Sequence, residues 1–309
     1  MAVEDTIREI FDSINMSHHL PDDVAHIEIN HNQVLASHTV PGLEIDAQEL
    51  PDGVEATFRV RAGHHIAKPV HLCFGMLPES GVQRIILHVH IEDGAKVEVV
   101  AHCTFPNAVD VQHLMNADIH IGENAEYSYF ERHVHGPDGG VTVVPKATVT
   151  VAEGGRFKTE FELIKGRVGI MDIEYETTCQ AHAVVEMVAR MSARGDDRIR
   201  IHEIANLVGE HSRGVLNSYI ALRGQAKAEI RNTLRATAAH ARGHVDCKEI
   251  VQDEAVASAI PVVEVLHPKA HVTHEAAIGS VDSKQLQTLM SRGLSEDEAV
   301  DLIIEGLLS

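Results

Sequence analysis

The sequence predicts an all-β core that folds as a parallel β-helix, with helices at both ends of the chain. Two observations predict this fold. From about residue 25 to residue 278, apolar and polar residues alternate, as in Ile119-His120-Ile121, and this period of two is typical of strands. A unit of apolar-x-apolar, a turn, a small residue and x-apolar also recurs about every 30 residues, or half of that, as expected for the coils of a solenoid. A jelly roll or β-sandwich is the alternative.

The chain divides into three expected segments. Residues 1–24 form an N-terminal helical segment, residues 25–280 the β-helix core and residues 281–309 a C-terminal helical segment. The first segment has apolar residues at helical spacing: Ile7, Ile10, Phe11 and Ile14. The scarcity of aromatic residues and the absence of Trp fit the narrow interior of a β-helix.

Two short amphipathic helices are predicted at the C-terminus. Asp282 with Gln285, and Ser295 with Glu298, have the spacing of capping boxes. Apolar residues follow at helical spacing: Leu286, Leu289 and Met290, then Ala299, Val300, Ile303, Ile304, Leu307 and Leu308. These helices either cap the open end of the solenoid or form a docking surface for a partner, and composition favours neither.

Composition limits the class of function. The 309 residues include 46 Asp and Glu against 26 Lys and Arg, a formal net charge of −20, so phosphate backbones are repelled and nucleic acid is not expected as a partner. No apolar run approaches the ~18 residues of a membrane-spanning helix, and the first residues lack the pattern of a signal peptide. The four cysteines form no close pair. We therefore expect a cytoplasmic protein in a reducing compartment.

Motifs of common nucleotide and hydrolase sites are absent from the sequence. It contains no G-x-x-x-x-G-K-[ST] loop, no G-x-G-x-x-G turn, no G-x-S-x-G elbow and no H-E-x-x-H pair. If the function consumes ATP, we expect another protein to bind it.

The 23 histidines include two pairs with the spacing of metal ligands. His88 with His90, and His133 with His135, each place two imidazoles on one face of a strand. Because some pairs arise by chance among so many histidines, we interpret both pairs as solvated surface residues.

Two other features are stronger candidates for metal ligands. A dense cluster near the C-terminal end consists of His267, His271 and His274, followed by Glu275. Cys247 has polar neighbours on both sides of its strand, which makes a purely apolar burial less expected. The remaining cysteines lie among apolar or small residues and are interpreted as core thiols: Cys73, Cys103 and Cys179.

Three motifs in the C-terminal part resemble a known family. Residues 260–265 contain Pro-x-x-Glu-Val, residues 272–276 contain His-Glu-Ala, and residues 291–299 contain Arg-Gly-Leu-x-Glu-x-x-Ala. Their order and spacing are similar to those of the SufB/SufD proteins, the scaffold components of the SUF iron–sulfur cluster assembly machinery. The length of the chain resembles that of compact archaeal-type members.

The resemblance implies a right-handed parallel β-helix and a set of partners. It implies a scaffold, not an enzyme, that assembles a transient iron–sulfur cluster, expected as [4Fe–4S], near a dimer interface and passes it to apo iron–sulfur proteins. The dimer would be a homodimer or a heterodimer with a paralogue. A SufC-type ABC ATPase would bind the C-terminal helices, and the expected docking residues are Leu286, Leu289, Met290, Arg292, Ala299, Ile303 and Ile304.

The resemblance also implies the metal ligands Cys247, His274 and Glu275. His274 and Glu275 match the family's His-Glu pair, and Thr273 replaces a Glu that often precedes this His in SufB. Cys247 is the cysteine on the strand upstream. An ungapped comparison places the family cysteine at Asp246, so either a β-bulge brings Cys247 to the same face or the assignment of Cys247 is wrong.

Two other functions are kept as alternatives. The first is a β-helix enzyme, metal-dependent or carbohydrate-active, that uses the histidines. Such enzymes are commonly secreted and bind sugars in clefts rich in aromatic residues, whereas this chain has neither feature. The second alternative is a purely structural interaction protein.

Overall fold

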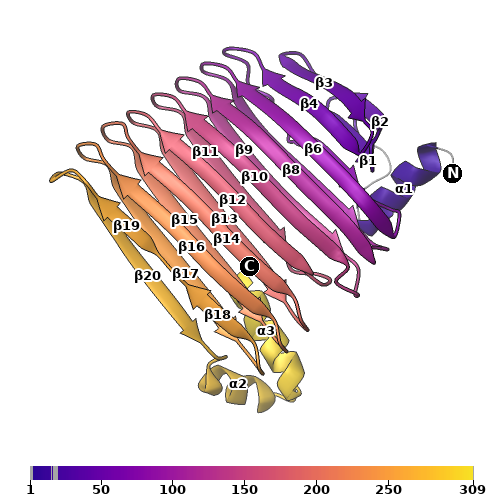
Figure 1. Cartoon of the computed structure of the whole chain (residues 1–309), viewed down its shortest axis with the longest axis vertical. Helices are drawn as coiled ribbons and strands as arrows, with labels where there is room; N and C mark the ends of the chain where they lie inside the picture. The colour runs from indigo at the N-terminus through magenta and orange to yellow at the C-terminus, as the bar shows by residue number, and fades with distance from the viewer. Residues whose placement is uncertain (1–2, 15, 17–19, 309) are drawn as a thin grey trace.

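The computed structural model describes residues 3–14, 16 and 20–308 and shows a parallel β-solenoid (Figure 1). Two 10-stranded sheets, called A and B, form its walls. From β4 to β17, successive strands alternate between the two sheets, so each coil contributes one strand to each wall. The predicted β-helix is therefore confirmed, and the jelly-roll alternative is wrong.

Neighbouring strands within each sheet come from successive coils. In spatial order, sheet A contains β2 (Gln33–His38), β1 (His26–Asn30), β5 (Val70–Gly75), β7 (Lys96–Phe105), β9 (Glu126–His135), β11 (Arg156–Leu163), β13 (Val184–Ala193), β15 (Arg213–Leu222), β17 (Arg242–Val251) and β20 (His271–Gly279). In spatial order, sheet B contains β18 (Val256–Ala259), β16 (Lys227–Ala236), β14 (Arg198–Leu207), β12 (Ile170–Cys179), β10 (Val141–Val151), β8 (Asp110–Ile121), β6 (Ser80–Ile91), β4 (Gly53–Val60) and β3 (Leu43–Leu50), and β19 (Val262–Val265) also pairs with β16.

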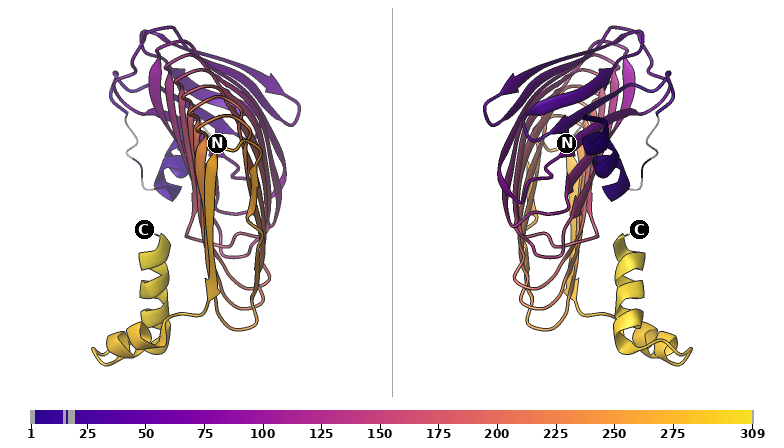
Figure 2. Two further views of the ribbon diagram at one scale, coloured as in Figure 1. Left: turned by 90° about the vertical axis from the view of Figure 1, so that its left-hand side faces the viewer. Right: turned by 90° about the vertical axis from the view of Figure 1, so that its right-hand side faces the viewer.

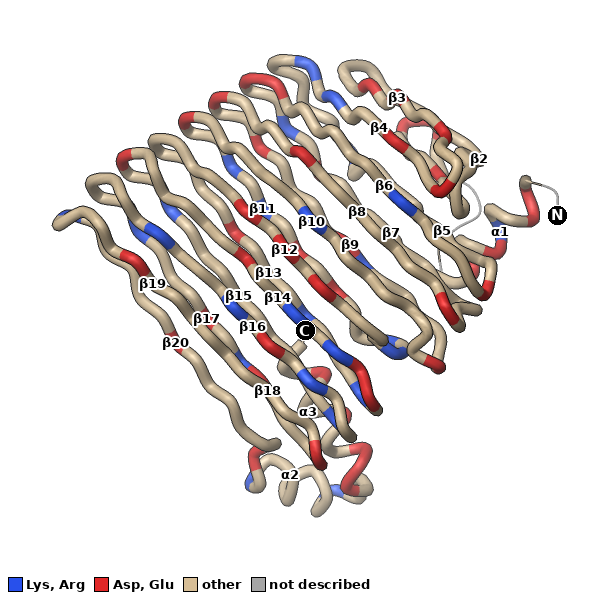
Figure 3. Tube along the Cα trace, viewed as in Figure 1, with Lys and Arg blue, Asp and Glu red and all other residues tan. Residues whose placement is uncertain are grey.

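Strands of successive coils pair in parallel, and residues about 30 positions apart become lateral neighbours. Side chains at equivalent positions of successive coils therefore stack on one another. On the outer faces, this stacking pairs opposite charges, as between Lys96 and Glu126 at 2.8 Å and between Lys146 and Glu174 at 2.9 Å. Figure 3 shows acidic and basic residues interspersed along the strands and turns.

The side chains that point between the two sheets form the core, called the lumen. Burial alternates along the strands, as in β10 and β12, because successive side chains point to opposite faces of a sheet. Most lumen residues are aliphatic, and Val151, Ile201 and Leu222 are fully buried. Burial of this continuous apolar stack is the main stabilising contribution.

All three helices lie outside the lumen, and Figure 2 shows α1 and the C-terminal helices on the same side of the solenoid. Helix α1 (Val3–Ser13) packs Ile10 and Phe11 against Cys73 of β5. The chain ends in α2 (Ser283–Met290) and α3 (Glu296–Leu308). No helix among the described residues is long and apolar enough to cross a membrane.

The predicted caps of the C-terminal helices are present. The Asp282 carboxylate accepts the backbone N–H of Gln285 at 2.7 Å. Glu298 accepts the backbone N–H of Ser295 at 2.8 Å, and Ser295 Oγ accepts the backbone N–H of Glu298 at 3.3 Å. These bonds satisfy helix N–H groups that have no partner within the helix.

The two ends of the solenoid differ. At the N-terminal end, antiparallel pairs of β1 with β2 and of β3 with β4 close the sheets. At the C-terminal end, β20 is the edge strand of sheet A, and all of its residues except Val272 are exposed. Large apolar side chains are exposed around this end: Val256, Ile260, Val265, Leu266 and Ile278.

Candidate functional site

Cys247 lies in the lumen near the open C-terminal end. Its side chain is fully buried, and its lateral partners are Ser218 on β15 and Ala276 on β20. The side-chain amide of Asn232, on sheet B, donates to Cys247 Sγ over 3.9 Å. Burial raises the pKa of this thiol to about 11, so the thiol carries its proton at neutral pH.

The strand that carries Cys247 contains no bulge. β17 pairs with β15 and with β20 residue by residue without a register shift, so the bulge alternative is wrong and the assignment of Cys247 stays a proposal. Asp246 points outward, where its carboxylate accepts hydrogen bonds from Tyr219 at 3.3 Å and from Lys248 at 2.8 Å. Of these two neighbours, only Cys247 presents its side chain to the lumen.

His274 and Glu275 lie on the exposed edge strand β20. His274 is the lateral partner of Val245 on β17. Because Val245 stands two residues before Cys247, both point to the same face of sheet A, and His274 lies on that face too. Glu275 is level with Asp246 and lies on the outer face. One copy of the chain thus brings His274 and Cys247 to the same face and leaves Glu275 on the opposite face.

Sequence reasoning missed a carboxylate beside Cys247. Glu249 follows on the same inward face, is 2% exposed, and has no hydrogen-bond partner at either carboxylate oxygen. Burial, with a smaller effect of Asp246, raises the pKa of Glu249 to about 7. Glu203 on β14 is also buried, and burial raises its pKa to about 8. The period of two along β17 could have revealed Glu249, because it stands two residues after Cys247.

The predicted cluster of three histidines is not assembled. His271 lies on the outer face because it is level with outward-pointing Arg242, and His267 lies in the preceding turn, where its Nδ1 accepts the backbone N–H of Lys269 at 3.1 Å. Within the described part of the chain, two groups place three potential ligand atoms within 4.8 Å of one another: Cys103, Glu131 and His133, and Glu210, His211 and His240.

The two histidine pairs of the sequence lie in different environments. His88 and His90 are half-buried on sheet B, on its outer face. His133 and His135 are 1% and 6% exposed and point into the lumen, so their interpretation as solvated residues is wrong. They continue the inward positions of β9, which begin at Tyr127.

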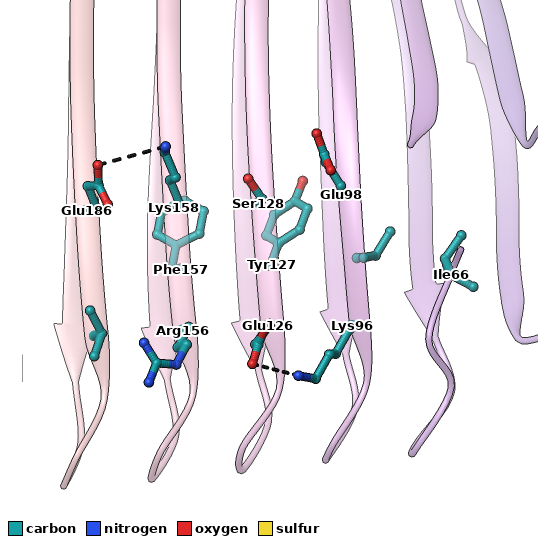
Figure 4. A pocket seen from close by; sticks show the side chains of 12 residues that line it. Ile66, Lys96, Glu98, Glu126, Tyr127, Ser128, Arg156, Phe157, Lys158 and Glu186 are labelled. Atoms are coloured by element: carbon teal, nitrogen blue, oxygen red, sulfur yellow. Dashed lines mark hydrogen bonds and ion pairs between the residues drawn. The ribbon is translucent and has the colours of Figure 1, made fainter. Parts of the chain in front are cut away.

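A shallow hollow crosses the first residues of β7, β9, β11 and β13 in sheet A (Figure 4). Lys96 and Glu126 form an ion pair of 2.8 Å at its rim. Its two aromatic residues, Tyr127 and Phe157, are each 3% exposed and stack on each other with ring centroids 5.8 Å apart. The hollow therefore lacks the exposed aromatic surface on which a carbohydrate-active enzyme would bind a sugar.

The C-terminal helices pack beside the solenoid rather than across its open end. Val300, Ile304 and Leu308 of α3 pack against Ala221 of sheet A, so the interpretation of the helix pair as an end cap is wrong. Arg223 fixes α3 further through ion pairs with two aspartates of that helix, at 2.7 and 3.0 Å.

The predicted docking residues differ in exposure. Ala299 and Ile304 are 0% and 6% exposed and pack within the chain itself. Half-buried positions are Leu286, Leu289 and Ile303, and exposed ones are Met290 and Arg292. A groove between α2 and α3 is lined by apolar Leu289, Leu302 and Ile303 and by polar residues of α2.

Residues 78–307 match the family profile of the SufBD core domain of the SUF system for FeS cluster assembly. The chain belongs to the SufBD family. An iron–sulfur cluster assembly SufBD family protein of Methanocaldococcus jannaschii is 34% identical over 313 residues, covering 100% of this chain and 99% of that protein. One of Pyrococcus horikoshii is 34% identical over 285 residues, covering 92% and 87%. The iron–sulfur cluster assembly protein SufB of Bacillus subtilis is 36% identical over 69 residues, covering 22% and 15%. Membership of the SufBD family supports a role in iron–sulfur cluster assembly.

Proposed function

We propose that this SufBD family chain is a scaffold on which an iron–sulfur cluster is assembled and from which it is transferred to apo proteins. Cys247 is the proposed thiolate ligand, and His274 and Glu249 are its proposed companions. One observation carries the assignment. The thiol and the imidazole share the lumen face of the paired strands β17 and β20 at the open end of the solenoid, where β20 is the edge strand.

The proposed ligands suit transient binding. Iron–sulfur clusters prefer thiolates, so a site with one thiolate and nitrogen or oxygen ligands holds a cluster more weakly than four thiolates do. A scaffold must release its product, and a weaker site favours release. Cys247 has to lose its proton to bind iron. Glu249 stands two residues further along the same face, and its pKa of about 7, raised by burial, suits it to accept this proton and to return it.

We further propose that two copies associate through the open end. The edge strand β20 presents unpaired backbone groups, and exposed Leu266 and Ile278 form part of an apolar surface around it. In a two-fold assembly, Cys247 and His274 from both copies would supply four ligands. A paralogous chain of the same fold could replace the second copy, which would give a heterodimer.

The groove between α2 and α3 is the proposed docking surface for a SufC-type ABC ATPase. Leu302 and Met290 beside it are 47% and 41% exposed. Ile304 of α3 packs against Ala221 of β15, and Ser218 of the same strand is the lateral partner of Cys247. If the ATPase displaced α3, the movement would therefore be transmitted to the cluster site through β15 alone.

Anaerobic reconstitution with iron and sulfide tests the proposed scaffold. We expect the wild-type protein and the Cys179→Ala variant to gain a cluster with broad visible absorbance, and the Cys247→Ala variant to gain none. Cys179 is a matched control because it is equally buried in the lumen. Full iron and sulfide content in Cys247→Ala would show that the proposed ligand is wrong.

A second comparison identifies the carboxylate ligand. Glu249→Gln should lower the cluster content, because Glu249 shares the lumen face with Cys247. Glu275→Gln should lower it only if the cluster is bound outside the lumen, since Glu275 lies on the outer face. Cluster loss in Glu275→Gln together with a normal cluster in Glu249→Gln would reverse the assignment.

A further inference from the structure

A second polar cluster lies in the lumen of the N-terminal half of the solenoid. Cys103 on β7, His113 on β8, and Glu131 and His133 on β9 are each at most 2% exposed. We propose that these four side chains form a binding site for a single divalent transition-metal ion. The site is separate from the proposed cluster site, because it uses neither Cys247 nor a second copy.

Cys103, Glu131 and His133 each place a ligand atom within 4.8 Å of the other two, and His113 lies next to Cys103 but outside this group. His133 Nε2 lies 2.7 Å from Glu131 Oε1, Cys103 Sγ lies 3.5 Å from the same oxygen, and His113 Nε2 lies 3.9 Å from Cys103 Sγ. An ion with bonds of about 2.0 Å to nitrogen and oxygen and about 2.3 Å to sulfur separates tetrahedral ligand atoms by roughly 3.3–3.6 Å. Small side-chain movements therefore suffice to bring Cys103, Glu131 and His133 to this spacing, and His113 has to turn towards them to complete the site.

Hydrogen bonds fix the tautomer of His113. The side-chain amide of Gln83 donates to the backbone carbonyls of His31 at 3.0 Å and Gly75 at 2.9 Å, which uses both of its N–H groups. Its oxygen therefore accepts a hydrogen bond from His113 Nδ1 at 2.9 Å. The lone pair of His113 Nε2 is left facing Cys103, and burial, with the nearby charge of His133, lowers the pKa of His113 to about 3.

A second chain of hydrogen bonds orients His133. The backbone carbonyl of Arg167 can only accept, so His135 donates to it from Nδ1 at 2.9 Å. Burial lowers the pKa of His135 well below its usual value, so its Nε2 accepts from His133 Nδ1 at 3.2 Å. His133 Nε2 then points at Glu131 with one shared proton between them. Histidines that bind metals are held in this way by a hydrogen bond at the other ring nitrogen.

Glu131 supplies an acceptor without a partner. Its second carboxylate oxygen, Oε2, is buried and makes no hydrogen bond. Burial is the largest effect and raises the pKa of Glu131, but the hydrogen bond and charge of His133, with smaller effects of His113 and Cys103, together outweigh it and hold the pKa below its usual range. An ionised carboxylate with a free buried oxygen is costly unless a cation or donor satisfies it.

The net charge of the buried cluster is the same with and without a divalent ion. Without metal, the hydrogen bond of 2.7 Å between His133 and Glu131 contains one proton, and the Cys103 thiol, which donates to Glu131 over 3.5 Å, carries a second. Binding of a divalent ion would release both protons and leave a thiolate and a carboxylate beside the ion. The net charge is zero in both states, so no uncompensated charge is buried.

The donor set indicates the class of ion. One thiolate, two imidazoles and one carboxylate suit Zn²⁺, Fe²⁺ or Co²⁺, whereas Mg²⁺ and Ca²⁺ prefer oxygen ligands alone.

Aromatic rings shield the site from water and restrict the imidazoles. Phe105 lies 5.2 Å from the His113 ring and Phe161 lies 4.7 Å from the His133 ring, measured between centroids.

Anaerobic titration with Co²⁺ tests this site, and the Cys247→Ala protein is used so that the proposed cluster site contributes no thiolate. We expect one Co²⁺ per chain with a thiolate-to-cobalt charge-transfer band, and release of about two protons per ion. Adding Cys103→Ser should remove the band, and adding Cys179→Ser should leave it. No band in the Cys247→Ala protein, or a band that survives Cys103→Ser, would overturn the proposal.

A conservative variant separates metal binding from folding. Glu131→Gln keeps the shape of the side chain but removes its charge, and it should weaken Co²⁺ binding at least tenfold, by about 1.4 kcal/mol or more. Thermal unfolding of the metal-free variant shows whether it is folded. An unchanged Co²⁺ affinity in folded Glu131→Gln would contradict the site. Failure of this test leaves the scaffold proposal intact, because reconstitution at Cys247 is measured independently.

Discussion

Cys103 on β7 and His133 on β9 are lateral partners in sheet A, one coil apart, and both point into the lumen. The same relationship joins Gln83 to His113 between β6 and β8 of sheet B. Parallel pairing in register therefore builds a polar cluster from residues that are distant in sequence. Which polar side chains meet in the lumen is therefore determined by which residues are separated by one coil length.

Glu203 should make stability depend on pH. Burial raises its folded-state pKa to about 8, above the value of about 4.5 in the unfolded chain. The unfolded chain therefore releases this proton at lower pH than the folded protein. The stabilising contribution is complete below pH ~4.5 and is lost as pH rises towards ~8, by a few kcal/mol at ~1.4 kcal/mol per pKa unit.

Urea unfolding of the wild type and of Glu203→Gln checks this dependence. The free energy of unfolding of the wild type should fall, relative to the variant, between pH 5 and pH 8. The comparison removes the contribution of other titrating groups, since these are common to both proteins. A constant difference between the two proteins across this range would show that Glu203 titrates as an exposed carboxyl does.

Ile278→Asp should weaken association of two copies. Ile278 is 48% exposed on the edge strand β20, and a carboxylate at this position would be buried without a partner in the proposed interface. We expect the dissociation constant to rise roughly 100-fold, or about 2.7 kcal/mol. Sedimentation equilibrium measures it.

Val109→Asp is the matched control for this substitution. Val109 is 63% exposed and precedes β8 in the N-terminal half of the chain, so its substitution should leave the assembly unchanged. Equal effects of the two variants would point to an interface elsewhere, or to a general effect of added negative charge on a chain of net charge −20.

Leu302→Asp should reduce binding of a SufC-type ATPase. Leu302 is 47% exposed and lines the groove between α2 and α3, so the substitution alters the docking surface without opening the packing of α3. We expect a loss of at least tenfold in affinity, measured by calorimetry with the purified ATPase. Ile170→Asp, on sheet B and 46% exposed, should bind normally. Tight binding by Leu302→Asp would exclude this groove.

The fold could be predicted in most respects because each of its features has a local signal. The period of two predicts strands, the repeat predicts coils, and the spacing of Ser295 and Glu298 predicts the start of α3. The position of α3 against Ala221 could not be predicted, since apolar helix faces do not indicate which surface they cover.

The candidate sites were only partly predictable for a related reason. The family resemblance predicts Cys247, His274 and Glu275 as ligands, but only the register of β17 and β20 shows that Cys247 and Glu275 lie on opposite faces. His133 was interpreted as a surface residue, because the sequence alone did not show which face of β9 is inward. The coil length was the available signal, since it makes Cys103 a neighbour of His133.

The antiparallel hairpins at the N-terminal end limit how copies of this chain can assemble. β2 and β3 occupy the edges of both sheets there, and β3 carries Glu44, Asp46 and Glu49, which disfavour further strand addition. At the C-terminal end of the described chain, the edge strand β20 pairs in parallel with β17 and is not covered by a hairpin. In the proposed pair, contact between two such ends would use the same surface twice, so assembly would stop at a closed pair instead of growing into a filament.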